Sequence, residues 1–165
     1  MMLEQTRKIL PILLISLGIS ACQPRQEVKT GQVAPKTVLL DLANQERKLT
    51  DYRGDVLFVN FWWAGCGPCL REMPELDEVY QAHKSEGFKV LGVNMGQTSS
   101  VIRNVNRRIG VTFPLFVDEL KITSQQYGVK FAPTSFLINR EGVIVEKIMG
   151  PVSKDELEEK ISHLL

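Results

Sequence analysis

Two long apolar runs separated by a helical pattern dominate the chain. Residues 56–62 (Val-Leu-Phe-Val-Asn-Phe-Trp) are apolar on both faces of an extended strand except at Asn60, which is typical of a central strand covered on both sides. A second run of this kind covers 88–94. Between them, apolar side chains recur every three or four residues over 68–85, which predicts an amphipathic helix.

The remaining apolar segments predict the rest of one sheet and its helices. Further strands are expected at 37–42, 115–117, 135–139 and 143–149. Further helices are expected from Ser99 or Ser100 to 109, at 122–127, and after a capping box formed by Ser153 and Glu156. Strands that first alternate with helices and then end in a hairpin predict an α/β domain. Its mixed central sheet is flanked by helices, with 37–42 as an N-terminal strand or hairpin extension.

The N-terminal segment has a different character. Arg7 and Lys8 precede an almost wholly apolar run at 9–19, which is too short to span about 30 Å of hydrocarbon comfortably. The run ends in Ile-Ser-Ala-Cys at 19–22, which resembles the bacterial lipobox, in which the cysteine is lipidated and becomes the mature N-terminus. An ordinary secretory signal with an incidental cysteine, or an uncleaved anchor, is the alternative interpretation.

These patterns divide the chain into three parts. We predict a lipoprotein signal peptide at 1–21, a lipid-anchored tether at 22–30 and one globular domain at 31–165. The 20 basic and 19 acidic residues leave a formal net charge of +1 with no block of one sign, so nothing points to a nucleic-acid partner. Of the three cysteines, lipidation of Cys22 would leave one pair, Cys66 and Cys69.

That pair forms the motif Cys66-Gly67-Pro68-Cys69 between a buried strand and a helix start. Unpaired backbone N–H groups and the positive end of the helix dipole stabilise a thiolate at such a position, so Cys66 is the expected nucleophile. Cys69, one turn deeper, would resolve the mixed disulfide. Pro68 suits the first helical turn, where its missing N–H costs nothing, and Gly67 keeps bulk away from the attacking sulfur.

Two other interpretations of the pair are weaker. A closed structural zinc site needs four ligands, and neither His83 nor His163 has ligand spacing to the cysteines. A purely structural disulfide across two intervening residues would close too small a loop to add much stability. The sequence therefore predicts a redox-active disulfide as the reacting group, with no further cofactor and no metal.

The motif and three other segments resemble the TlpA/ResA-like branch of the thioredoxin superfamily. These segments are 71–74 (Arg-Glu-Met-Pro), 113–114 (Phe-Pro) and 132–138 (Ala-Pro-Thr-Ser-Phe-Leu-Ile), and the resemblance runs from about Gly31 to the C-terminus. It implies a thioredoxin-like fold and a membrane-anchored thiol–disulfide oxidoreductase of the cell envelope, facing outside the cytoplasm. It further implies a monomer that exchanges disulfides with exported proteins, apocytochrome c among them, and is renewed by a membrane dithiol donor.

The resemblance also implies several site residues. A cis peptide bond at Pro133 would turn the backbone of Ala132 toward the sulfurs, where it can pair with an extended substrate, although Pro133 alone could equally be a trans turn residue. Trp62 and Trp63 are expected to contact the substrate. Relatives usually carry Trp immediately before the first cysteine, where this chain has Gly65, so we expect a more open sulfur.

Glu72 is the candidate acid–base group. Asn60 replaces the buried Asp of cytoplasmic thioredoxins and cannot accept a proton, whereas Glu72 lies three residues after Cys69 on the same helix. A solvated Glu on the helix surface is the alternative interpretation.

Two competing functions share this fold. A peroxidase would need Thr or Ser three residues before the reactive cysteine, where this chain has Trp63. A non-enzymatic copper chaperone or binding module of the Sco-like kind would space its cysteines by three residues and add a later histidine. The intervening Gly-Pro matches cytoplasmic thioredoxin and favours a reductant over an oxidant.

Overall fold

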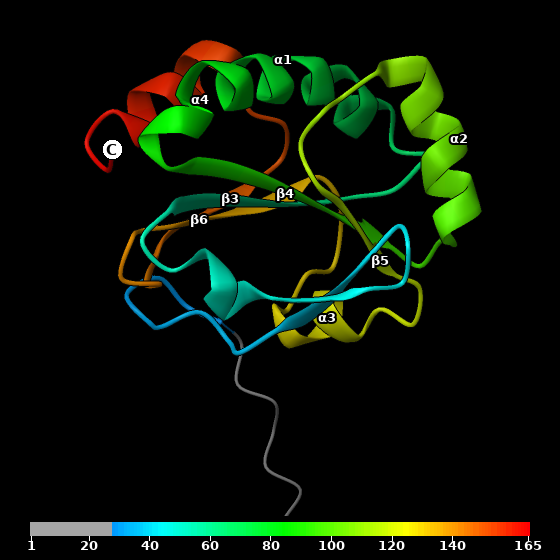
Figure 1. The fold of residues 1–165 in the computed structure, drawn as a ribbon, viewed down its shortest axis with the longest axis horizontal. Helices are drawn as coiled ribbons and strands as arrows, with labels where there is room; N and C mark the ends of the chain where they lie inside the picture. The colour runs from blue at the N-terminus through cyan, green and yellow to red at the C-terminus, as the bar shows by residue number, and fades with distance from the viewer. Residues whose placement is uncertain (1–27) are drawn as a thin grey trace, which may run out of the picture.

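The computed structural model describes residues 28–165, which form one seven-stranded mixed sheet with helices on both faces (Figure 1). The strands lie in the order β2-β1-β5-β4-β3-β6-β7. Their bounds are β1 Val38–Asp41, β2 Glu46–Lys48, β3 Val56–Trp62, β4 Phe88–Met95, β5 Leu115–Asp118, β6 Thr134–Ile138 and β7 Ile144–Met149. Strands β3, β4 and β5 are parallel, and the other neighbouring pairs are antiparallel. The predicted α/β fold with a mixed central sheet is confirmed, and the N-terminal extension, expected as a strand or a hairpin at 37–42, is the hairpin of β1 and β2.

The helices cover the sheet unevenly. Helices α1 (Gly67–His83), α2 (Ser99–Ile109) and α4 (Lys154–Ile161) lie on one face, and α3 (Ile122–Gln126) lies on the other (Figure 1). Two 3-10 turns, η1 (Leu49–Tyr52) and η2 (Lys84–Glu86), complete the elements. The capping box predicted for the last helix is present, because Ser153 and Glu156 satisfy each other's backbone N–H groups.

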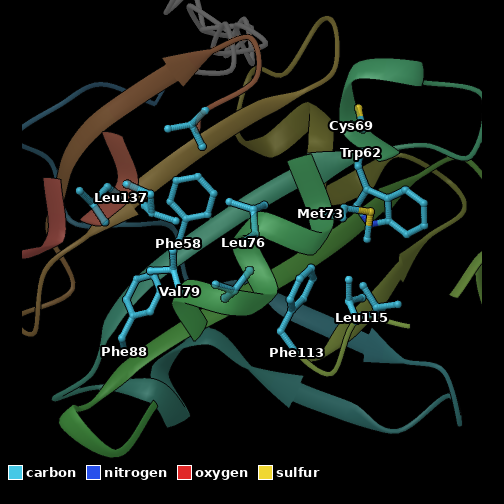
Figure 2. Packing of buried hydrophobic residues seen from close by; sticks show 14 of the residues in the cluster. Phe58, Trp62, Cys69, Met73, Leu76, Val79, Phe88, Phe113, Leu115 and Leu137 are labelled. Carbon is cyan, nitrogen blue, oxygen red and sulfur yellow. The ribbon is translucent and has the colours of Figure 1, made fainter. Parts of the chain in front are cut away.

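The core has two layers, one on each face of the sheet. Alternate side chains of a strand point to opposite faces, so Phe58 and Trp62 pack under α1 whereas Val59 and Phe61 pack on the other side. Met73, Leu76 and Val79 supply the apolar side of α1 to the first layer. Within that layer Cys69 lies near one end and Phe88 near the other (Figure 2).

The segments that carry the sequence motifs meet at one end of the strands, the end at which β3 stops. Strand β3 lies between β4 and β6 and ends at Trp62. Because β6 runs antiparallel to β3, with Phe61 opposite Thr134, the start of β6 lies beside the end of β3. The loop before Cys66 and the loop that holds Pro133 therefore meet at this end of the strands.

The predicted signal peptide, its Cys22 and the first part of the tether lie outside the described residues. Within the described part of the chain, no helix has both the length and the apolar character needed to cross a membrane.

Candidate active site

The cysteine pair begins helix α1. Cys66 is the residue immediately before the helix, and its Sγ accepts a hydrogen bond from the Cys69 amide at 3.2 Å. The two cysteines are joined as a disulfide with their Cα atoms 5.3 Å apart. Cys66 retains 5% of its surface and Cys69 retains none. An attacking thiolate can therefore reach only the Cys66 sulfur, which also lies where helix-terminal N–H groups stabilise negative charge.

The two intervening residues fit the first helical turn. Gly67 and Pro68 are the first residues of α1, where a proline lacks only an N–H that the helix would leave unpaired. A Cβ at Gly67 would lie 3.3 Å from the Arg71 guanidinium, so this small residue leaves room for that side chain.

Trp63 covers the position where relatives carry their tryptophan. A Cβ built on Gly65 would lie 2.1 Å from Cζ3 of the Trp63 ring, so the indole occupies the space that a side chain at Gly65 would need. The ring is 44% exposed. The aromatic wall beside the motif is thus supplied from two residues earlier in the chain. Cys66 itself retains only 5% of its surface.

Trp62 differs from its neighbour and from our expectation. Its side chain is fully buried in the core layer under α1 (Figure 2). Successive strand residues face opposite ways, and position 62 shares with Phe58 the face of β3 that lies under α1. The predicted contact between Trp62 and a substrate is therefore a misassignment: this indole packs beneath the motif.

The loop before β6 contains the expected cis bond, between Ala132 and Pro133. The Pro133 carbonyl accepts a hydrogen bond from the Gly150 amide at 2.9 Å, and Thr134 Oγ1 donates to the Phe131 carbonyl at 2.9 Å. Neither backbone group of Ala132 has a hydrogen-bond partner among residues 28–165. Ala132 thus offers one free donor and one free acceptor at the end of the strands where the motif lies.

Glu72 is buried, so the interpretation as a solvated helix-surface Glu is wrong. Its carboxylate accepts hydrogen bonds from Asn60 Nδ2 at 2.8 Å and from the Val152 amide at 3.0 Å. Asn60 Nδ2 also donates to Ser135 Oγ at 3.0 Å. Burial raises the pKa of Glu72 to about 7, although the two donors act in the opposite direction. A carboxyl that titrates near neutral pH can accept or donate a proton under ordinary conditions.

Gln97 is a site residue that the sequence did not reveal. Its Oε1 accepts from the Ala64 amide at 2.7 Å and from Asn94 Nδ2 at 3.1 Å. The loop after β4 therefore fixes the turn that carries Trp63. No local signal marks this residue, because its partner at Ala64 lies in a different strand–helix connection.

No three His, Cys, Asp or Glu side chains within 28–165 come together as a metal-binding group. The chemistry available at this end of the strands is that of a disulfide, an acidic group with a pKa near neutrality and a free backbone segment.

Known proteins resemble the chain over nearly its whole length. The model of the AhpC/TSA family matches residues 30–147. Thiol-disulfide oxidoreductase ResA of Geobacillus thermodenitrificans is 36% identical over 94% of this chain and 92% of its own length. ResA of Bacillus subtilis is 32% identical over 88% of this chain and 84% of its own length.

Solved structures of thiol–disulfide oxidoreductases have a similar fold. A Chlorobium tepidum protein assigned as thiol:disulfide interchange protein DsbE superposes with a TM-score of 0.78 at 30% identity, covering 84% of this chain and 99% of that one. The thioredoxin domain of a thiol-disulfide oxidoreductase of Bacteroides vulgatus gives 0.73 at 26% identity, covering 83% and 98%. The chain therefore belongs to the AhpC/TSA family of the thioredoxin superfamily and, within it, to the ResA-like thiol–disulfide oxidoreductases.

Proposed function

We propose that this oxidoreductase works in the cell envelope, outside the cytoplasm, where it reduces disulfides of exported proteins, apocytochrome c among them. The observation that carries the proposal is the Cys66–Cys69 disulfide at the start of α1, at the same end of the strands as the loop with cis Pro133. A monomer suffices, because Cys66, Cys69 and Glu72 all lie in one chain.

The cycle transfers two electrons from the cysteine pair to the client. The Cys66 thiolate attacks one client sulfur, a mixed disulfide forms, and the other client sulfur leaves as a thiolate that takes a proton. Cys69 then loses its proton and attacks Cys66 Sγ, which closes the Cys66–Cys69 disulfide and releases the second client thiol. A membrane dithiol donor would return the pair to its reduced form.

Glu72 is proposed to accept the proton of Cys69. Cys69 has no exposed surface, so its proton needs a group inside the protein, and Glu72 lies one turn further along α1. With a pKa of about 7, the carboxyl is partly ionised under ordinary conditions. In Glu72→Gln, we expect the rate of mixed-disulfide resolution to lose its pH dependence near neutrality. An unchanged pH profile would remove Glu72 from the mechanism.

Matched cysteine variants test the cycle directly. Reduced Cys69→Ser can attack a client disulfide but cannot resolve the product, so mass spectrometry should detect the trapped mixed disulfide. Cys66→Ser should trap none and should lack exchange activity. Exchange by Cys66→Ser at the wild-type rate would overturn the assignment of the nucleophile.

The direction of transfer rests on the Gly67-Pro68 pair and needs its own measurement. Equilibration with glutathione buffers should give a potential toward the reducing end of the range of about −270 to −120 mV found for such motifs. A value near the oxidising end would make the protein a disulfide donor.

Membrane attachment is proposed through lipidation of Cys22, at the end of a signal peptide at 1–21, with the tether at 22–30 joining it to the domain at 31–165. Cells fed labelled palmitate should incorporate label into the wild-type chain and not into Cys22→Ala. Equal labelling of both would exclude lipidation at this residue.

A further inference from the structure

A groove whose lining does not include Glu72 opens next to the active site. Its lining comes from the end of β4 and from four connections between strands and helices: Trp63, Met95, Gly96, Gln97, Lys121, Lys130, Phe131 and Ala132. We call it the Trp63–Phe131 groove. It is continuous with the site, because Trp63 lies three residues before Cys66 and Ala132 immediately precedes cis Pro133.

Two aromatic side chains in the groove are accessible. Trp63 is 44% exposed and Phe131 is 52% exposed, although tryptophan and phenylalanine side chains are usually more buried. The same groove is lined by Ala132, whose backbone amide and carbonyl have no hydrogen-bond partner among residues 28–165. Exposed aromatic rings beside free backbone groups suit an extended peptide that pairs its main chain and packs an apolar side chain.

The charged groups in the groove are both basic. Lys121 and Lys130 are exposed, and neither ammonium has an acidic partner within 28–165. The Lys121 side chain lies across Gly96, where an added Cβ would be 2.6 Å from its Cε. The backbone at Gly96 therefore lets the Lys121 stem lie along the groove.

A second pocket beside the motif contains more acidic than basic side chains. The pocket there is lined by Pro68, Arg71, Glu72, Glu75, Pro151, Val152, Ser153 and Glu156. Apart from the buried Glu72, it presents two exposed carboxylates, Glu75 and Glu156, and one exposed guanidinium, Arg71. An acidic segment of a client would be repelled there and attracted by Lys121 and Lys130. The charge distribution thus favours one of the two grooves for such a segment.

With the client main chain at Ala132, we propose that Lys121, Lys130 and Phe131 make the Trp63–Phe131 groove select segments that carry an acidic and an apolar side chain beside the client cysteine. The inference rests on the proposed reductase function and adds the chemistry of the client. The main chain of the client pairs with Ala132, its apolar side chain packs between Trp63 and Phe131, and its carboxylate lies near the two ammonium groups.

The test uses the whole reduced domain and two disulfide-closed peptides that differ only in having Glu or Lys beside one cysteine. Wild type should reduce the Glu peptide about 10-fold faster at low salt, since opposite charges speed encounter and like charges slow it. The ratio should shrink when salt shortens the Debye length from about 30 Å to about 8 Å.

Charge reversal supplies the decisive variant. Lys121→Glu with Lys130→Glu should invert the preference for the Glu peptide. Lys29→Glu with Lys36→Glu is the matched control, because these exposed lysines lie outside the groove, and it should keep the wild-type preference. Phe131→Ala should weaken discrimination between Leu and Ser placed beside the Glu.

The possible failures separate the two proposals. Equal rates for both peptides in wild type, or the same shift in both double variants, would overturn the groove while leaving the reductase function intact. A wild-type protein that reduces neither peptide and exchanges with no small dithiol would overturn the proposed function itself.

Discussion

Replacing Glu72 by Gln should change how stability depends on pH. Burial moves the pKa of Glu72 from its ordinary 4.5 to about 7 in the folded protein. The folded state therefore binds the carboxyl proton of Glu72 more tightly than the unfolded chain does. The stability that this protonation adds is complete below about pH 4.5 and is lost as the pH rises through about 7. At about 1.4 kcal/mol per pH unit, the loss amounts to about 3 kcal/mol.

Urea unfolding of the oxidised protein at several pH values measures this effect. From about pH 4 to about pH 8, the free energy of unfolding of wild type should fall by about 3 kcal/mol relative to Glu72→Gln. The variant also alters the hydrogen bonds with Asn60 and Val152, but that cost is constant over the range, so only the change with pH matters.

The control for this experiment is Glu119→Gln, a change at an exposed carboxylate. It should run parallel to wild type at every pH. If the wild-type and Glu72→Gln curves are parallel too, the carboxyl does not hold its proton more tightly on folding, and its proposed role in the proton transfer from Cys69 loses its basis.

Three further changes probe packing and capping. Gly65→Ala should displace the Trp63 ring, whose nearest atom lies 2.1 Å from the added Cβ, and this should shift the tryptophan emission and lower the free energy of unfolding. Adding Trp63→Ala to this variant should remove the clash and restore the lost stability. Leu76→Ala in the core should cost about 2–5 kcal/mol in urea unfolding, whereas Leu120→Ala, at a side chain that is 76% exposed, should change stability by less than about 0.5 kcal/mol. Ser153→Ala should cost about 1 kcal/mol by removing the cap of α4, and equal stability would show that the cap contributes nothing.

The strands that sequence predicts best are those buried on both faces. The run at 56–62 has the bounds of β3, and the run at 88–94 differs from β4 by one residue, because two-sided burial leaves an unbroken apolar signal. Strand β2 was missed for the opposite reason. Its residues Glu46, Arg47 and Lys48 are all exposed at the sheet edge, where charged side chains discourage pairing with other chains.

Among the site residues, too, some could be predicted from the sequence and others could not. The cysteine pair was recognisable because its geometry is encoded in four consecutive residues at a helix start. Trp62 was misassigned because it is the last residue of a strand that is buried on both faces, so its side chain is covered whichever face it points to. Gln97 and the Val152 amide could not be foreseen, since their partners lie 33 and 80 residues away and one of the groups is backbone.

The connection from β7 to α4 holds two parts of the active site in place. It contains residues 150–153, and within it the Gly150 amide binds the Pro133 carbonyl while the Val152 amide binds Glu72. Gly150 has a φ of 104°, a conformation that glycine adopts without strain. This short connection thus links the loop with cis Pro133 to the buried Glu72. Inserting one residue into it would break one of the two hydrogen bonds, and the positions of the loop and of the acid would no longer depend on each other.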